Sequence, residues 1–433
     1  MDTKLMRLCR HAIEYLFYLF IFLLPWQTKL ILRSADNNFN EIAVYATHVL
    51  LLVILILFFV HKLRTRSGQE KISALWISLC GLEVFVLISF FFAPDQVLAF
   101  FHYVLFLVGV GLFYLLREGI RPAAYDEKGL NRATIIYSFL AGIFFQAALG
   151  IYQFLSQSAF ACKYLGLAAH HADILGTAVV ETTSGRWLRA YGGFDHPNIF
   201  GGVLAISMII AAYLLAKKKI IASAREISES IFLFVFYFVS LFALFFTFSR
   251  SAWLALVFGL LVLLVVLIIQ KDRWIIDRLL ALIFFSAVML FVVAMPYKEL
   301  VRVRIVGETR LEEKSLSERR EYLSQSFTLI KEKPVFGVGF GNYSRALEVR
   351  DEIKKESWAY QPVHNVFLLF WAESGIMALM FFLGFLFLAV KKRRNLVVPG
   401  AVFGALLVLM VFDHWLLSLP FGLIFLFLIL GLL

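Results

Sequence analysis

Arginine, histidine and asparagine side chains recur at the boundaries of the apolar segments of this sequence. The residues concerned are Arg186, Arg189, His196, Asn198, Arg250, Arg319, Arg320, His364 and Asn365. Guanidinium groups give charge-assisted, bidentate hydrogen bonds to phosphate oxygens and stay charged at any working pH. An imidazole, with an ordinary pKa of about 6.5, takes up a proton near neutrality. If the fold gathers these residues at one face, they predict a phosphate or diphosphate site with a general base beside it.

Each of these residues also has a purely structural interpretation. An arginine in a loop is usually solvated or paired with lipid headgroups, and His364 could simply begin a helix. Arg250 favours the functional interpretation most, because the short turn from Thr247 to Arg250 separates two long apolar segments. Such a turn leaves the side chain only the membrane interface or an inner cavity. The arginines that are expected near His364 strengthen its functional interpretation.

Metal and nucleotide chemistry have less support. His196 together with His170 and His171 suggests a metal site, but the spacing is irregular and no cysteine or carboxylate cluster completes it. The glycines of the run 337–341 lack the strand–turn–helix context of a dinucleotide fingerprint. We interpret them as a tight turn or a close backbone approach to a ligand. The sequence therefore predicts no metal ion and no cofactor.

The elements that must position these side chains are membrane helices. Of the 433 residues, 61% are hydrophobic and only 16% are charged, and the mean hydropathy is +0.84, far outside the range of soluble globular proteins. A bilayer core takes about 20 apolar residues per helix. Segments of that kind predict an all-α polytopic membrane protein with about twelve transmembrane helices and a single membrane domain over 1–433. The expected spans are 12–26, 42–60, 72–92, 97–116, 133–155, 198–216, 230–248, 251–269, 279–296, 365–390, 396–412 and 414–433.

The basic residues predict the orientation, because loops on the cytoplasmic side hold the excess of lysine and arginine. With the N-terminus inside, the inner segments hold 22 of the 41 basic residues and the short outer loops hold 6. The other 13 lie in 297–364, a long outer segment of the kind that crosses largely regardless of charge. Both termini are therefore expected in the cytoplasm. The net charge of +11 reflects topology, and we expect no nucleic-acid partner.

Two outer segments, 156–197 and 297–364, are too long to be mere connectors. The second contains an amphipathic stretch in which Ser315 and Glu318 have the spacing of a capping box and Pro334 ends the helix. Its apolar stripe would consist of Leu323, Phe327 and Ile330. This pattern predicts a helix that lies on the outer membrane surface or over the mouth of a cavity.

The order of these motifs resembles the O-antigen ligase and O-antigen polymerase family of bacterial envelope glycosyltransferases. The similar segments are 185–202 (GRWLRAYGGFDHPNIFGG), 247–253 (TFSRSAW), 317–343 and 364–378 (HNVFLLFWAESGIMA). Ligases of the family carry His, then Asn, Ser or Gln, nine residues, Gly, two residues, and Gly, Thr or Tyr. His364, Asn365 and Gly375 fit this pattern, whereas Ala378 departs from it. The first half of the chain is similar only as a run of apolar segments.

The resemblance implies a type C-like membrane glycosyltransferase architecture in the bacterial inner membrane, with the active site facing the periplasm. The donor would be a glycan linked to undecaprenyl diphosphate. The acceptor would be a hydroxyl group, with a lipid A–core sugar favoured over other glycans. Many type C enzymes hold a metal through an acidic pair in the first outer loop, whereas Asp36 and Glu41 here lack that adjacent pairing. Transfer without a metal ion is therefore expected.

Within this resemblance, His364 is the expected general base of an inverting displacement. Arg186, Arg189, Arg250 and Arg319 are the expected ligands of the diphosphate, and His196, Asn198, Asn365 and Arg320 are the expected supporting residues. Arg319 is preferred to Arg320 because it matches the family's arginine when the loop is aligned on Pro334. Two alternatives stay open. One is a polymerase that uses a second lipid-linked glycan as the acceptor, and the other is a transporter or flippase of lipid-linked glycans.

Overall fold

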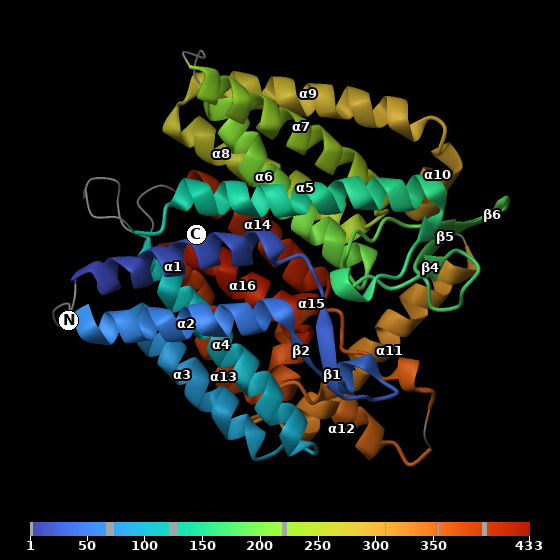
Figure 1. Cartoon of the computed structure of the whole chain (residues 1–433). Helices are drawn as coiled ribbons and strands as arrows, with labels where there is room; N and C mark the ends of the chain where they lie inside the picture. Colours follow the sequence, from blue (N-terminus) through green and yellow to red (C-terminus); the bar gives the residue numbers. More distant parts are fainter. Residues whose placement is uncertain are drawn as a thin grey trace.

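The computed structural model describes residues 3–65, 73–120, 129–218, 223–307, 309–353, 355–391 and 396–433. Its helices are α1 Thr3–Leu23, α2 Ala46–Thr65, α3 Ala74–Phe90, α4 Gln96–Gly119, α5 Arg132–Ser156, α6 Pro197–Lys217, α7 Ala224–Phe246, α8 Arg250–Gln270, α9 Arg273–Ala294, α10 Lys298–Val306, α11 Arg310–Glu332, α12 Tyr343–Arg350, α13 Val366–Lys391, α14 Val397–Phe412, α15 Trp415–Ser418 and α16 Pro420–Leu432. The long helices run side by side, and the strands gather with α10, α11 and α12 toward one end of the bundle, away from the N-terminus (Figure 1). We call this the loop end.

The apolar helices confirm an all-α polytopic membrane protein. Among the described residues, α2, α4, α5, α6, α7, α8, α9 and α13 are long and apolar enough to cross a membrane. The helices α3, α14 and α16 are also apolar but have 17, 16 and 13 residues. Each expected span overlaps a helix, with two differences: residues 42–45 of the second span form a strand before α2, and the C-terminal end departs as well. The segment 414–433 is not a single helix, because Pro420 cannot continue a helix from α15 and instead begins α16.

Helix α6 lies at the centre of the bundle and packs against α7, α8, α9 and α14. Small residues allow this close packing, as is usual between membrane helices. A Cβ on Gly202 would lie 2.9 Å from the ring of Trp415, and one on Gly201 would lie 2.8 Å from Ala252 of α8. The first turn of α6 is therefore fixed against both the start of α8 and the segment that follows α14.

Helix α13 is broken at Gly375, and the glycine run 337–341 fills the break. Gly375 has a φ of +82°, and a Cβ there would lie 1.9 Å from the carbonyl oxygen of Val335. The freed amide of Ile376 donates to the carbonyl of Pro334 at 3.0 Å. The glycine run is thus a close backbone approach to other parts of the protein: Gly337 to Glu373 of α13, Gly339 to Ala93 and Gly341 to His102 of α4. It anchors the end of α11 against α13, which brings α11 close to the start of α13 where His364 lies.

The expected capping box of α11 is wrong. The helix begins at Arg310, after Thr309, so Ser315 lies inside the helix. Glu312 and Glu313 occupy the first turn, where negative charge favours a helix N-terminus. The expected apolar stripe is also split: Ile330 is buried, whereas Leu323 and Phe327 are exposed. The buried face of α11 consists of Glu312, Tyr322, Ser326, Leu329 and Ile330.

Short antiparallel hairpins also lie at the loop end. Strand β1 (Lys29–Arg33) pairs with β2 (Ile42–Tyr45), β3 (Ser158–Ala159) with β4 (His170–His171), and β5 (Val179–Thr182) with β6 (Gly185–Leu188). Single turns of 3-10 helix lie at η1 Asn38–Asn40, η2 Lys163–Leu165 and η3 Ser357–Ala359. The loop between β1 and β2 carries η1, and the segment 297–364 carries α10, α11, α12 and η3. These parts surround the site described next.

Candidate active site

A cavity of about 400 Å³ opens at the loop end, where α6, α8 and α13 begin and α14 ends. Its lining residues are Arg189, His196, Asn198, Arg250, Ser251, Leu254, Arg304, Ser315, Leu316, Glu318, Arg319, Tyr322, Gln361, His364 and Phe412. Six of the residues singled out in the sequence are therefore brought together, although they come from separate parts of the chain. They are Arg189, His196, Asn198, Arg250, Arg319 and His364.

Three of the expected residues do not line this cavity. Arg186 lies in β6 opposite Glu181 of β5, and its guanidinium donates to the carbonyl of Asp173 at 3.4 Å. Because it does not line the cavity, the expected diphosphate contact from Arg186 stays a prediction. Arg320 is exposed on α11. Asn365 caps α13 by accepting from the amide of Leu368 at 3.0 Å.

Two arginines hold the turn between α7 and α8. Phe248, a buried residue, has a φ of +47°, a left-handed conformation that is strained for a residue other than glycine. Its carbonyl accepts hydrogen bonds from Arg304 Nε at 3.0 Å and Nη2 at 2.7 Å. The carbonyl of Thr247 accepts one from Arg189 Nε at 2.6 Å. These contacts place both guanidinium groups beside Arg250, the first residue of α8.

Arg250 and Arg304 share one buried carboxylate. Glu312 lies 2.9 Å from Arg250 Nη2 through Oε2 and pairs with Arg304 Nη1 through Oε1. Arg319, on the same helix as Glu312, also lines the cavity and has no hydrogen-bond or ion-pair partner among the described residues. Four guanidinium groups thus face two carboxylates, those of Glu312 and Glu318. The wall of the cavity is net positive, which suits an anionic ligand.

Asp413 links the arginines to His364. Arg189 Nη2 donates to Asn198 Oδ1 at 2.8 Å, and Asn198 Nδ2 donates to Asp413 Oδ2 at 3.2 Å. The other carboxylate oxygen of Asp413 accepts from the backbone amide of His414 at 2.8 Å and lies 3.7 Å from His364 Nδ1. An imidazole beside an oriented carboxylate is the arrangement of a general base whose positive form is stabilised.

Burial sets the charge of the groups around His364. It lowers the pKa of His414 to about 3 and, together with Arg189, that of His196 to about 3, so both imidazoles are neutral near pH 7. Burial alone would raise the pKa of Asp413, but His364 and the other imidazoles outweigh it and hold that pKa below its usual range. Burial lowers the pKa of Arg189 to about 9, which leaves it cationic at neutral pH.

His196 acts at the start of α6. Its Nδ1 accepts a hydrogen bond from the amide of Asn198 at 3.1 Å and thereby caps the helix. This contact uses the lone pair that a general base would need. His364 is different, because its Nδ1 lies 3.7 Å from the carboxylate of Asp413 and its side chain keeps 22% of its surface exposed. Of the two imidazoles, His364 is therefore the one that can exchange a proton with a substrate.

His364, Asp413 and His414 also offer three ligand-type atoms within 4.8 Å of one another, a spacing that could hold a metal ion. The metal interpretation considered in the sequence used His170 and His171 instead. Those two residues lie in β4, and His170 stacks on Tyr191 with ring centroids 4.1 Å apart. Neither lines the cavity.

Sequence reasoning missed several residues of the site, above all Asp413, Arg304 and Glu312. Asp413 did give a signal, since it is an ionisable residue between two apolar segments, and such residues are costly unless they have a function or a partner. Arg304 and Glu312 gave none that distinguished them from the other charged residues of the segment 297–364. Their roles depend on the path of α10 and α11 across the turn at Phe248.

Residues 233–383 match the family model described as O-antigen ligase. This part of the chain is similar to the O-antigen ligase family. The matched part includes Arg250, Arg319 and His364, and the fold of the whole chain is that of a multi-pass membrane protein. No curated protein matches the chain.

The O-antigen ligase segment does not contain the whole cavity. Arg189 and Asn198 precede the segment, and Asp413 follows it. These three form a hydrogen-bonded path that ends at Asp413, 3.7 Å from His364 Nδ1, so the complete site requires α6 and the end of α14 as well. The family match supports an enzyme of the O-antigen ligase or polymerase type, and the chemistry of the individual residues is argued below.

The buried neutral histidines predict that acid destabilises the protein. Because the folded-state pKa of His414 is about 3, the unfolded chain takes up a proton below about pH 6.5 that the folded chain does not. The free energy of unfolding should therefore fall by about 1 kcal/mol for this residue between pH 7.5 and 5.5. Thermal unfolding in detergent would measure the loss. His414→Gln should show a smaller fall in Tm over this range than the wild type, whereas a control change at exposed His171 should not. An equal fall in all three would contradict burial as the cause.

Proposed function

We propose that the protein is an O-antigen ligase-type glycosyltransferase. It moves a glycan from undecaprenyl diphosphate to an acceptor hydroxyl, a lipid A–core sugar being favoured, at the periplasmic face of the bacterial inner membrane. Both termini then lie in the cytoplasm. The observation that carries the proposal is one cavity in which His364, paired with Asp413, lies with four arginines.

The arginines are suited to the diphosphate of the donor. Arg250 and Arg319 are its proposed ligands, joined by Arg189 and by Arg304, which the sequence did not single out. Arg250 and Ser251 also open α8, and the free amides of a helix N-terminus favour a phosphate group. Apolar side chains from α8, α11 and α14 also line the cavity, and a polyprenyl chain requires such contacts. They are Leu254, Leu316 and Phe412.

His364 is the proposed general base. The acceptor oxygen attacks the anomeric carbon while the bond from that carbon to the diphosphate oxygen breaks, so the anomeric configuration inverts. The hydroxyl proton passes to His364, and Asp413 stabilises the imidazolium that forms. The electron pair of the broken bond stays on the diphosphate, where the arginines neutralise the developing charge. Undecaprenyl diphosphate then leaves.

Transfer is expected to continue after divalent metal ions are removed. The arginines supply the positive charge that a metal ion supplies in other glycosyltransferases, and in this proposal the lone pair of His364 serves the substrate. The measurement is the rate of glycan transfer by purified protein before and after treatment with EDTA. A rate that is lost with EDTA and restored by one divalent ion would contradict the proposal and would favour His364, Asp413 and His414 as ligands.

Glycan profiling after loss of the gene tests the function. A ligase predicts that complete polymer accumulates without attachment to the lipid A–core acceptor. Single attached repeat units would instead indicate a polymerase, which runs the same chemistry with a lipid-linked acceptor. Lipid-linked units held at the cytoplasmic face would indicate a flippase.

A further inference from the structure

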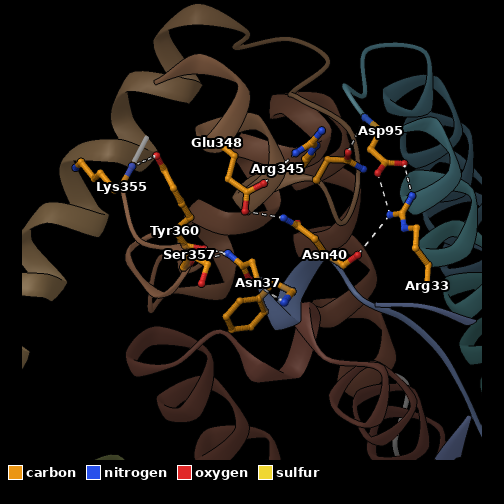
Figure 2. Close-up of polar contacts among 11 residues, drawn as sticks. Arg33, Asn37, Asn40, Asp95, Arg345, Glu348, Lys355, Ser357 and Tyr360 are labelled. Carbon is orange, nitrogen blue, oxygen red and sulfur yellow. Dashed lines mark hydrogen bonds and ion pairs between the residues drawn. The ribbon is translucent and has the colours of Figure 1, made fainter. Parts of the chain in front are cut away.

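The loop between β1 and β2 reaches across to the segment that leads into His364. Asn37 Nδ2 donates to the carbonyl of Ser357 at 3.1 Å and to that of Tyr360 at 2.9 Å (Figure 2). We call residues 355–363 the strap. Asn37 is 5% exposed, and the contact joins two parts of the chain about 320 positions apart.

The orientation of this amide is unambiguous. Its Oδ1 accepts from the backbone amide of Phe39 at 2.9 Å, and that group can only donate. The two carbonyls of the strap can only accept, so the nitrogen must face them. Both N–H groups of the side-chain nitrogen of Asn37 are therefore used as donors. The side chain of Asn37 therefore closes the turn of η1 and satisfies carbonyls at the end of η3 at the same time.

The strap connects the residues held by Asn37 to His364. Tyr360 is buried, and its hydroxyl accepts from the backbone amide of Lys355 at 2.9 Å, which closes the strap on itself. Three residues separate Tyr360, whose carbonyl accepts from Asn37, from His364. Among them, Gln361 lines the cavity and Val363 is buried. On the far side of His364, the cap made by Asn365 fixes the start of α13.

The same loop touches the site from a second direction. The ring of Phe39 packs edge-on against His414 with centroids 5.4 Å apart. The ring of His414 in turn lies 4.8 Å from that of His364. The turn closed by Asn37 thus contacts both the strap before His364 and the imidazole beside it.

We propose that Asn37 is a positioning residue for glycan transfer. It holds the strap so that His364 stays at the distance from Asp413 and the arginines at which it can accept the proton. The proposal rests on the proposed role of His364 as the base. It also makes the N-terminal hairpin, which lies outside the matched family segment, a part of the working site.

Asn37→Asp is the sharpest test, because it keeps the acceptor for Phe39 and replaces only the nitrogen that faces the two carbonyls. We expect kcat to fall on the order of 10-fold to 100-fold, as for a small misplacement of a catalytic group. The KM for the lipid-linked donor should stay within about twofold, because the arginines are held by other contacts.

Asn40→Asp is the matched control. Asn40 lies in the same loop, is 6% exposed, and donates through Nδ2 to Glu348 of α12 at 2.8 Å rather than to the strap (Figure 2). The same chemical change there should lower Tm to a similar extent and leave kcat near that of the wild type. If both variants lose turnover in proportion to their loss of Tm, Asn37 is merely structural and the proposal is overturned.

A second measurement does not depend on activity. The rate at which diethyl pyrocarbonate modifies His364, followed by mass spectrometry, should change at least twofold in Asn37→Asp and remain unchanged in Asn40→Asp. If Asn37→Asp does not insert into the membrane, Asn37→Ala removes the same donors without adding charge. An unchanged rate in the inserted variant would overturn the proposal. If His364→Ala stays active while this rate still changes, it is the assignment of the base that fails, and not the link from Asn37 to His364.

Discussion

Replacement of His364 by alanine should lower glycan transfer by about 10²-fold to 10⁴-fold, the usual contribution of a positioned general base. No other imidazole can take over. His414 is buried, the pKa values of both His414 and His196 are lowered to about 3, and the lone pair of His196 caps α6. The measurement is transfer from a lipid-linked donor in membranes, with the amount of inserted protein determined in parallel.

The control for this change is His171→Ala, which alters an exposed histidine of the same loop end. Its transfer rate should equal that of the wild type. A correctly inserted His364→Ala protein that transfers glycan at the normal rate would remove His364 from the mechanism. The hydrogen bonds that join Arg189, Asn198 and Asp413 would then have a role other than orienting a general base.

The second large effect is expected at Arg319 and not at its neighbour. Arg319 lines the cavity without a partner among the described residues, whereas Arg320 is exposed. A phosphate group of the ligand can therefore bind Arg319 without breaking an existing ion pair. Arg319→Ala should lower kcat/KM by about 10²-fold to 10³-fold, the effect of removing one group that stabilises a developing anion.

Arg320→Ala is the internal control, since it removes the same charge from the same turn of α11. Its kcat/KM should stay within about twofold of the wild type, and Tm should be little changed in both variants. Equal losses at the two positions would mean that the general positive charge of α11 matters and not a specific contact. A larger loss in Arg320→Ala would reverse the assignment of the two side chains.

Much of the membrane fold follows from the sequence, because apolar length and polar interruption are local properties. The short turn at Arg250, the start of α6 beside Asn198 and the start of α13 beside His364 all fall where hydropathy changes. That is why six predicted site residues meet in one cavity. The glycine run was also interpreted as a tight turn or a close backbone approach to a ligand, but its glycines approach α13, Ala93 and α4.

Contacts between distant segments could not be predicted in this way. Arg186 and Arg189 looked equivalent in sequence, but the hairpin of β5 and β6 separates them, and only Arg189 reaches Asn198. The start of α11 was misplaced because Ser315 and Glu318 satisfy a local capping pattern, while Glu312 in the first turn is held by arginines from two other helices. The contact of Asn37 with the strap likewise has no local signature.

Reconstitution tests the central claim most directly. The purified full chain, placed in liposomes with an undecaprenyl-diphosphate-linked glycan and a lipid A–core acceptor, should release one undecaprenyl diphosphate for every glycan transferred. Both products should form about 10²-fold to 10⁴-fold more slowly with His364→Ala. Movement of the intact donor between the leaflets, with no undecaprenyl diphosphate released by the wild-type protein, would contradict the account.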